Sequence, residues 1–354
     1  MRIKRLTGYM EEAGLDAYII SKSPNVYYFT GTISGGKLIL TRDDPPVLLT
    51  SRLNMACAKD QSRGCEVRPC TRHDMLEKMV ASLQASDPRK IGFDDISLSL
   101  YNDLKEKIPN ATLMEAPEIV REMRMIKDSE EIELMRRAGA LADSGMEAIR
   151  DCIGEGVREN EVAAEAAYAM RKQGADALAF PFIVVSGPRS AYPHGGVTER
   201  KIRKGEFVTI DMGASFREYK SDITRTFIVG TPIERQRDIY ETVLQTNMAA
   251  LDLIRKGETG FDVHMVAAKL IEDAGYGEHF IHDLGHGVGL EVHEGPNLGK
   301  TSKDTLRKGM VVTDEPGIYI HGFGGVRIED TVLVTDSAPE RLTRYAKDLD
   351  AMRV

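Results

Sequence analysis

The sequence predicts an α/β domain followed by an α+β domain that is built from two similar halves. Three observations lead to this prediction. Residues 1–120 alternate between helical and strand patterns, a charged segment near residues 122–127 precedes a long helical pattern, and the rest of the chain repeats itself. We place the domains at residues 1–124 and 125–354. A chain of 354 residues exceeds the usual size of one domain, which agrees with two.

The first domain shows short elements separated by turn residues. Residues 3–13 fit an amphipathic helix that ends at Gly14, and residues 17–20 fit a buried strand. One histidine, His73, and no cluster of reactive side chains occur here, so we expect this domain to cover a site or to contact another subunit. The other predicted elements are hairpin strands at 37–41 and 46–50, helices at 53–60 and 97–108, and a strand at 91–93.

The second domain begins with a long helical pattern. Ser129 is a favourable N-cap residue, and the apolar residues after it recur at helical spacing. We therefore expect a helix to begin next to the domain boundary. Its apolar stripe consists of Ile132, Leu134, Met135, Ala138 and Leu141.

An internal repeat organises the second domain. Residues 156–162 align without gaps with residues 257–263 at an offset of 101, and residues 202–213 align with residues 306–317 at an offset of 104. Each half therefore reads as helices followed by antiparallel strands. Two such halves, packed about a pseudo-twofold axis, would bring corresponding residues together. The strands that matter most are expected at residues 207–212, 221–227 and 326–333.

Carboxylates occupy matching places in the two halves. The repeat aligns Asp211 with Glu315, and each half supplies a second carboxylate, Asp222 or Glu329, from its next strand. Alternation along a strand places each carboxylate beside a hydroxyl group or an arginine that could orient it. The predicted orienting residues are Tyr219, Thr224 and Arg327, with Thr209, Thr226, Thr331 and Arg225 as further candidates.

These carboxylates and the imidazoles between residues 282 and 331 predict a metal centre. Four carboxylates at close range would repel one another and take up protons in the absence of a cation. The oxygen-rich set suits Mn(II) first, or Mg(II), with Co(II), Fe(II) and Zn(II) as alternatives. Two ions roughly 3.5–4 Å apart would lower the pKa of a bridging water to about 7, and such a hydroxide predicts hydrolysis of a carbonyl compound. The expected ligands are Asp211, Asp222, His286, Glu315 and Glu329.

The carboxylates could instead be solvated strand ends, although their matching positions in the repeat disfavour this. Histidine placement points to the same region, because six of the eight histidines lie between His264 and His321. His194 precedes the first carboxylate strand, and an imidazole near the ions could stabilise an oxyanion. His282 lies one turn from His286 and could either support the site or pack in the core. The histidines expected to be structural are His73, His264, His279 and His321.

Composition excludes several classes of protein. The net charge of −8 argues against a nucleic-acid-binding protein, which needs a basic surface. No stretch approaches the roughly 18 apolar residues of a membrane span, and residues 1–20 do not read as a signal peptide. The four cysteines lack disulfide spacing, and Cys65 and Cys70 are expected to be free thiols rather than a metal site. We expect a cytoplasmic protein.

Six motifs between residues 180 and 331 together resemble those of the pita-bread metallopeptidases, the family of prolidase, Xaa-Pro aminopeptidase, methionine aminopeptidase and creatinase. Residues 25–31 are similar to an amino-terminal motif of the prolidase and Xaa-Pro aminopeptidase branch, with Tyr27 where arginine is common. Methionine aminopeptidases lack that domain, so the resemblance favours the proline-directed branch. The six motifs are Asp-Met-Gly at 211–213, Ser-Asp-Ile-Thr-Arg-Thr-Phe at 221–227, Gly-His-Gly at 285–287, His-Glu-Gly-Pro at 293–296, Glu-Pro-Gly at 315–317 and Arg-Ile-Glu-Asp at 327–330.

The resemblance implies a creatinase-like α/β domain and a pita-bread domain, in which helices flank a curved antiparallel sheet. It also implies how the ligands divide between the two ions. Asp211 would hold one ion through both oxygens, and Asp222 and Glu329 would bridge both ions. His286 and Glu315 would complete the coordination of the other ion.

The resemblance further assigns catalytic roles. Glu315 would carry a proton from the attacking water to the leaving nitrogen, and His194 and His293 would contact the substrate and the intermediate. Residues 190–192, Ser-Ala-Tyr, depart from the common pattern, which leaves the shape of the substrate pocket open. A homodimer is expected.

The expected activity is hydrolysis of the bond that precedes proline in Xaa-Pro dipeptides by a metal-bridging hydroxide. This bond has no N–H and the proline ring constrains the chain, so general peptidases handle it poorly. An Xaa-Pro aminopeptidase acting on longer peptides is the nearest alternative. A non-catalytic binding module of the same fold and a creatine-type amidinohydrolase are disfavoured because all five ligands are present. Residues 180–182, Phe-Pro-Phe, could accept the proline ring or belong to the core.

Overall fold

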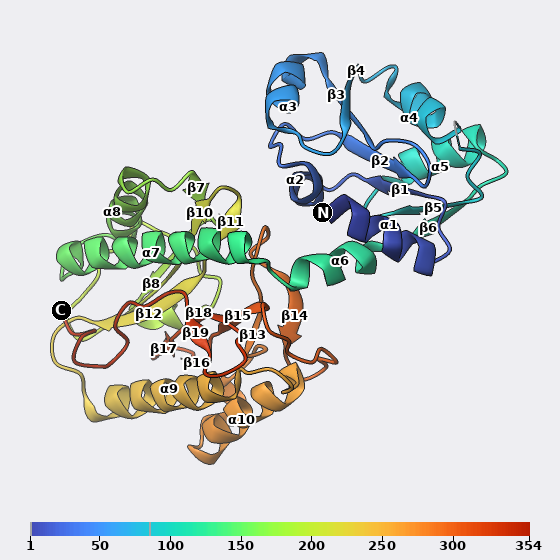
Figure 1. Ribbon diagram of the computed structural model, residues 1–354. Helices are drawn as coiled ribbons and strands as arrows, with labels where there is room; N and C mark the ends of the chain where they lie inside the picture. Colours follow the sequence, from blue (N-terminus) through green and yellow to red (C-terminus); the bar gives the residue numbers. More distant parts are fainter. Residues whose placement is uncertain (1, 85) are drawn as a thin grey trace. The chain divides into compact units, whose positions relative to one another are not determined.

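The computed structural model describes residues 2–84 and 86–354 (Figure 1). The chain divides into two compact units, Met1–Met123 and Arg124–Val354, one residue before the predicted boundary. Helix α6, Pro117–Met125, includes residues of both units.

The first unit is built on a mixed sheet of six strands in the order β4-β3-β2-β1-β5-β6. β1 pairs antiparallel with β2 and parallel with β5, and β2 forms the predicted hairpin with β3. The predicted α/β architecture is confirmed. The strands are β1 Ala17–Ile20, β2 Lys37–Thr41, β3 Val47–Ser51, β4 Glu66–Cys70, β5 Lys90–Phe93 and β6 Thr112–Glu115. The helices are α1 Arg2–Glu12, α2 Ser23–Thr30, η1 Arg52–Asn54, α3 Met55–Gln61, α4 Met75–Gln84 and α5 Leu98–Lys107, with α6 following.

Apolar packing explains why these segments form strands. All four residues of β1 are buried, and Ile19 lies in one apolar cluster with Leu49 of β3 and Ile91 of β5. The helix predicted at 53–60 begins differently, with the 3-10 turn η1 ahead of α3. Ser51 caps this turn, because its hydroxyl accepts a hydrogen bond from the Asn54 N–H at 3.3 Å.

Four long helices and a set of short strands form the second unit. α7 packs against α8, α9 packs against α10, and most of the strands lie between α7 and α9 (Figure 1). The helices are α7 Ser129–Cys152, α8 Glu159–Lys172, α9 Glu234–Leu253 and α10 Gly260–Asp273, with the 3-10 turns η2 Gly187–Ala191 and η3 Gly277–His279. The strands are β7 Ala177–Leu178, β8 Ile183–Ser186, β9 Phe207–Met212, β10 Ala214–Phe216, β11 Tyr219–Lys220, β12 Ile223–Ile228, β13 Gly285–Gly287, β14 Glu294–Leu298, β15 Val311–Asp314, β16 Gly317–Ile320, β17 Gly324–Arg327, β18 Asp330–Leu333 and β19 Glu340–Arg341. None of the helices within residues 2–84 and 86–354 combines the length and apolarity that a membrane crossing requires.

The N-cap of α7 is Asp128 rather than the predicted Ser129. The Asp128 carboxylate accepts a hydrogen bond from the Glu131 N–H at 3.0 Å, and the Glu131 carboxylate accepts one from the Asp128 N–H at 2.9 Å. This reciprocal capping box satisfies two backbone donors at once, which a cap at Ser129 would not do.

The backbone confirms the two similar halves. α8 and α10 each contain 14 residues, and their first residues, Glu159 and Gly260, stand at the offset of the repeat. The Gly156 N–H donates to Ile202 O and the Gly257 N–H donates to Leu306 O, both at 2.9 Å. In each half a short strand then pairs antiparallel with the carboxylate strand, β8 with β9 and β13 with β15.

The two halves meet where β12 approaches the segment that carries Glu329. The strand predicted at 326–333 is not continuous, because β17 ends at Arg327 and β18 begins at Asp330. Glu329 lies in the gap and forms a bridge with Thr224 of β12, and its N–H donates to Thr224 O at 3.0 Å. The break therefore lets Glu329 pair with the other half instead of with its own sheet.

Candidate metal centre

The five predicted ligands come from both halves of the second unit. Asp211 is the penultimate residue of β9, and Asp222 directly precedes β12. In the other half, His286 is the middle residue of β13, Glu315 follows β15, and Glu329 lies between β17 and β18. Each acidic ligand therefore stands at or next to the end of a strand.

Four of these residues meet directly. Ligand atoms of Asp222, His286 and Glu329 all lie within 4.8 Å of one another. The His286 Nε2 atom is 3.8 Å from Asp222 Oδ2 and 3.2 Å from Glu315 Oε1. Carboxylates from the two halves thus surround one imidazole.

Arg327 and Thr224 link Asp211 to this group. Arg327 Nη2 donates to Asp211 Oδ2 at 2.6 Å, and Arg327 Nε donates to Thr224 Oγ1 at 3.1 Å. The Thr224 hydroxyl then donates to Glu329 Oε2 at 2.6 Å. Thr224 and Arg327 are buried, so these hydrogen bonds are shielded from water and orient the carboxylates of Asp211 and Glu329.

Thr313 orients the predicted ligands of the second half, and the sequence reasoning did not single it out. Its hydroxyl accepts a hydrogen bond from the His286 N–H at 3.0 Å and donates to Glu315 Oε1 at 2.9 Å. A Cβ atom on Gly285 would lie 2.2 Å from Thr313 O, so a glycine is required there. The repeat contained the signal, because it aligns Thr313 with Thr209, one of the candidate orienting residues.

The His286 ring has a defined orientation. Its Nδ1 atom lies 3.1 Å from Gly287 O, and a carbonyl can only accept a hydrogen bond. Nδ1 therefore carries the hydrogen, and Nε2 faces Asp222 and Glu315. An imidazole held in this way presents Nε2 to a metal ion.

Burial and mutual repulsion shift the pKa values of the cluster. Burial, followed by the charges of neighbouring carboxylates, raises the pKa of Asp222 and of Glu329 well above their usual values. Burial also raises the pKa of Asp211, although the charge of Arg327 opposes it. Burial would raise the pKa of Glu315 too, but His286 outweighs it and lowers this pKa to about 2. Burial lowers the pKa of His286, and Glu315 reverses this so that the pKa is raised.

These features fit a site for divalent cations. Oδ1 of Asp211 and Oδ1 of Asp222 are buried and accept no hydrogen bond from residues 2–84 and 86–354. A buried carboxylate oxygen without a donor is costly unless a proton or a cation neutralises it. Carboxylate oxygens with one imidazole suit Mn(II) and similar ions.

Two further predicted residues border the cluster. The His293 ring centroid lies 4.2 Å from that of His286, and the side chain is exposed. Burial of part of the ring, followed by the charge of His286, lowers the pKa of His293. His194 is exposed in the loop after η2. Burial is the main cause that lowers the pKa of His282 and of His293, and proximity to His194 adds to it in both cases. The exposed imidazoles of His194 and His293 are therefore accessible from outside the cluster.

His282 supports the site through Tyr319. Its Nδ1 atom lies 2.7 Å from Asp283 O, and its Nε2 atom lies 2.9 Å from Tyr319 Oη. Arg327 Nη1 donates to the same Tyr319 oxygen at 2.9 Å. Because Nδ1 must donate to the carbonyl, Nε2 accepts from the Tyr319 hydroxyl. Of the two readings for His282, the structure favours support of the site, because a chain of hydrogen bonds connects it to Asp211.

Tyr219 and Arg225 make other contacts. The Tyr219 hydroxyl donates to Glu131 Oε1 at 2.7 Å, so an orienting role at the metal centre stays a prediction. Arg225 is fully buried and donates to Glu329 O at 2.6 Å and to Asp330 Oδ1 at 2.7 Å. Arg225 therefore holds the backbone of Glu329, a predicted ligand, and not its carboxylate.

Two residues with alternative readings belong to the core. His264 is fully buried, its Nδ1 atom accepts a hydrogen bond from the Leu284 N–H at 3.1 Å, and burial lowers its pKa. The structural interpretation of His264 therefore holds. Phe182, one of the aromatic residues considered for the proline pocket, packs in the apolar core of the second unit.

Comparisons with known proteins match both units. Residues 133–336 match the model of Metallopeptidase family M24, and residues 2–126 match that of the Creatinase/Prolidase N-terminal domain. A protein of Pyrococcus furiosus named Xaa-Pro dipeptidase is 40% identical over 350 residues, which span 98% of this chain and 99% of that protein.

Solved structures give the same result. The crystal structure of the prolidase from Pyrococcus horikoshii OT3 matches with a TM-score of 0.93 and 38% identity, over 98% of this chain and 99% of that one. An X-Pro aminopeptidase from Thermotoga maritima matches with a TM-score of 0.88 and 33% identity, over 96% and 98% of the two chains.

Proposed function

Because this chain belongs to metallopeptidase family M24, we propose that it is an Xaa-Pro dipeptidase, which hydrolyses the peptide bond that precedes proline. One observation carries the proposal. Asp222, His286 and Glu329 converge in a chain that is 40% identical, over almost its whole length, to a protein named Xaa-Pro dipeptidase. The bond before proline lacks an N–H, so it calls for a dedicated enzyme.

The proposed centre holds two divalent ions, with Mn(II) as the first choice and Co(II), Fe(II) or Zn(II) as alternatives. Bound ions of this kind supply Lewis-acid activation of water and of the scissile carbonyl. Asp211 would bind one ion, and Asp222 and Glu329 would bind both. His286 and Glu315 would complete the coordination of the other ion. The buried Oδ1 atoms of Asp211 and Asp222 support this assignment.

In the proposed reaction Glu315 moves the proton. It accepts a proton from the attacking water and passes it to the leaving nitrogen of proline. The Thr313 hydroxyl holds Glu315 Oε1 at 2.9 Å, which fixes the carboxylate for this transfer. His194 and His293 would bind the scissile carbonyl and stabilise the oxyanion, which agrees with their exposure beside the cluster.

The substrate length can be tested with two peptides. An Xaa-Pro aminopeptidase remains the second candidate, because an enzyme with that name matches almost the whole chain. The dipeptidase proposal predicts faster hydrolysis of Ala-Pro than of Ala-Pro-Ala-Ala with Mn(II) or Co(II) present. The opposite order would favour the aminopeptidase, and no turnover of either peptide would contradict both.

The remaining proposals concern metal uptake, assembly and location. A non-catalytic binding module of the same fold predicts no tight metal uptake, so about two equivalents of metal per chain, as a dinuclear site requires, would exclude it. We also propose a homodimer, which light scattering of the purified protein would test. A cytoplasmic location stays a prediction, and cell fractionation would test it.

A further inference from the structure

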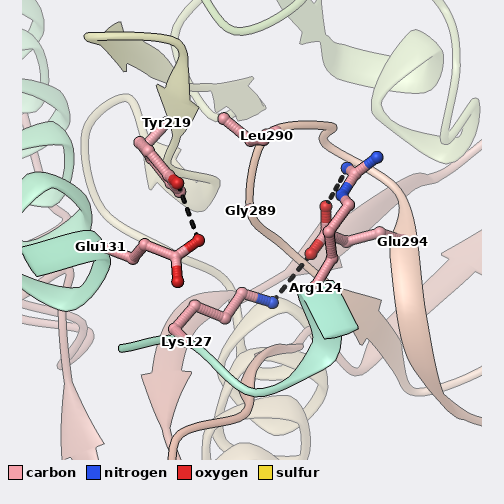
Figure 2. A pocket seen from close by; sticks show the side chains of 7 residues that line it. All are labelled: Arg124, Lys127, Glu131, Tyr219, Gly289, Leu290 and Glu294. Atoms are coloured by element: carbon pink, nitrogen blue, oxygen red, sulfur yellow. Dashed lines mark hydrogen bonds and ion pairs between the residues drawn. The ribbon is translucent and has the colours of Figure 1, made fainter. Parts of the chain in front are cut away.

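Four charged side chains form a cluster beside the hairpin of β13 and β14. Lys127 Nζ donates to Glu294 Oε1 at 2.8 Å, and Arg124 Nη2 donates to Glu294 Oε2. Arg124 Nη1 also donates to Glu291 Oε2 at 2.9 Å. Figure 2 shows Arg124 and Lys127 approaching the Glu294 carboxylate from the segment that leads into α7.

Three of the four side chains are almost sealed from solvent, whereas that of Glu291 is 27% exposed. The side chains of Arg124 and Glu294 are 8% exposed and that of Lys127 is 1% exposed. Buried ion pairs tolerate neither the loss of one partner nor a change of geometry, because an unpaired buried charge is costly. The position of Glu294 is therefore tied to Arg124 and Lys127.

These residues also border a narrow recess that leaves no room for a water molecule. Its walls are occupied by ion pairs and by the Tyr219–Glu131 hydrogen bond (Figure 2). We interpret the recess as a gap in side-chain packing and not as a ligand site. The lining residues are Arg124, Lys127, Glu131, Tyr219, Gly289, Leu290 and Glu294.

The hairpin closes tightly on the Glu294 carboxylate. Glu294 is the first residue of β14 and is paired with Gly287, the residue after the proposed ligand His286. A Cβ atom on Gly289 would lie 2.4 Å from Glu294 Oε1, so the loop backbone rests directly on this carboxylate. The Lys220 N–H donates to Gly289 O at 2.8 Å and holds the loop from its other side.

His293 immediately precedes Glu294 in this hairpin. His293 lies in the bend that leads into β14 and is joined to Glu294 by one peptide bond, so fixing Glu294 restricts where the His293 side chain can lie. The His293 ring lies against His286, with 4.2 Å between the ring centroids. We propose that Arg124 and Lys127 are positioning residues, which clamp Glu294 and thereby place His293 at the border of the metal centre. The catalytic consequence of this clamp rests on the proposed function.

A double-mutant cycle tests the clamp through activity. Lys127→Met should lower kcat for the preferred Xaa-Pro peptide by about 10- to 100-fold, because a small displacement of a catalytic group has effects of this size. KM should change less than kcat, since the lost stabilisation of the oxyanion forms only in the transition state. In a His293→Ala background the same substitution should cause almost no further loss. Equal losses in both backgrounds would overturn the proposal.

Arg136→Gln is the matched control. Arg136 lies in α7 and pairs with Glu133 and Glu340 in a half-exposed cluster of the same unit. This substitution removes a comparable charge but should leave kcat, KM and the His293 environment unchanged. If Lys127→Met fails to fold, Glu294→Gln serves instead, because it keeps the side-chain shape and one accepting oxygen but removes the charge and one of the two acceptors. Glu294→Gln should likewise lower kcat in the wild-type background and cause almost no further loss in the His293→Ala background.

A second readout does not depend on turnover. In protein loaded with diamagnetic Zn(II), the ring ¹⁵N signals of His293, assigned by their loss in His293→Ala, should shift in Lys127→Met and not in Arg136→Gln. Unchanged His293 signals in Lys127→Met would overturn the clamp. If the wild-type protein cleaves neither Ala-Pro nor Ala-Pro-Ala-Ala but these signals still shift, the proposed function fails and the clamp stands.

Discussion

Replacing Thr224 with valine removes one hydroxyl group from the proposed metal centre and keeps the side-chain shape. This hydroxyl donates to Glu329 at 2.6 Å and accepts from Arg327 at 3.1 Å. Each hydrogen bond to a charged group contributes about 1.5–3 kcal/mol. Loss of a partner that orients a metal ligand lowers metal affinity by about 10- to 100-fold, which corresponds to about 1.4–2.8 kcal/mol. We therefore expect Mn(II) affinity to fall by this factor.

The pH dependence of binding sharpens this prediction. Burial raises the pKa of Glu329, and the hydrogen bond from Thr224 opposes the rise. Without the hydroxyl the pKa rises further, so a proton competes better with the metal and the loss of affinity should grow as the pH falls.

Isothermal titration with Mn(II) measures the effect, with Thr226→Val as the control. Thr226 lies on the same face of β12, and its hydroxyl contacts Thr209 at 3.0 Å and Arg327 O at 3.0 Å, but no carboxylate among the contacts described. The control should lose stability without losing metal affinity. If Thr224→Val binds Mn(II) with an affinity within about threefold of the wild type, the two binding free energies differ by less than about 0.7 kcal/mol. That result would refute the reasoning.

Two further predictions concern pH and the buried arginine. The raised pKa values of Asp222 and Glu329 mean that the metal-free protein loses stability as the pH rises from the unfolded value near 4 through the folded values. Mn(II) should therefore raise the melting temperature more at about pH 8 than at about pH 5, and an equal rise would contradict this. Asp330→Asn should lower the free energy of unfolding by about 3–5 kcal/mol, because Arg225 loses its buried partner. Burial raises the pKa of Asp330, but Arg225 and Lys347 lower it to about 2, so its contribution is complete above about pH 4 and is lost as the pH falls towards 2. The difference in unfolding free energy between the wild type and Asp330→Asn, measured by urea unfolding, should therefore shrink as the pH falls. A difference that is constant with pH would refute this.

The internal repeat made the fold of the second unit predictable. Matching glycines and helix starts recur at one offset, and the structure places α8 and α10 at that offset. Strand alternation also predicted that Thr224 and Arg327 would lie beside carboxylates, because the face on which a strand residue lies depends only on its position along the strand. The partners differ from that expectation: alternation put Thr224 beside Asp222 and Arg327 beside Glu329, whereas Thr224 donates to Glu329 and Arg327 to Asp211, each in the other half.

The features that the sequence did not predict depend on contacts between distant segments. The break between Arg327 and Asp330 exists because Glu329 pairs with Thr224 in the other half, and no local pattern marks it. The clamp on Glu294 joins residues about 170 positions apart in the chain. The sequence marked residues 122–127 only as a charged boundary segment, while the fold buries Arg124 against the hairpin.

The shared cation pair is the central claim, and anomalous diffraction from a crystal grown with Mn(II) tests it most directly. We predict two peaks roughly 3.5–4 Å apart, contacted by Asp211, Asp222, His286, Glu315 and Glu329. A map without peaks at this position, or one in which Asp211 and Glu329 turn away from each other, would contradict it.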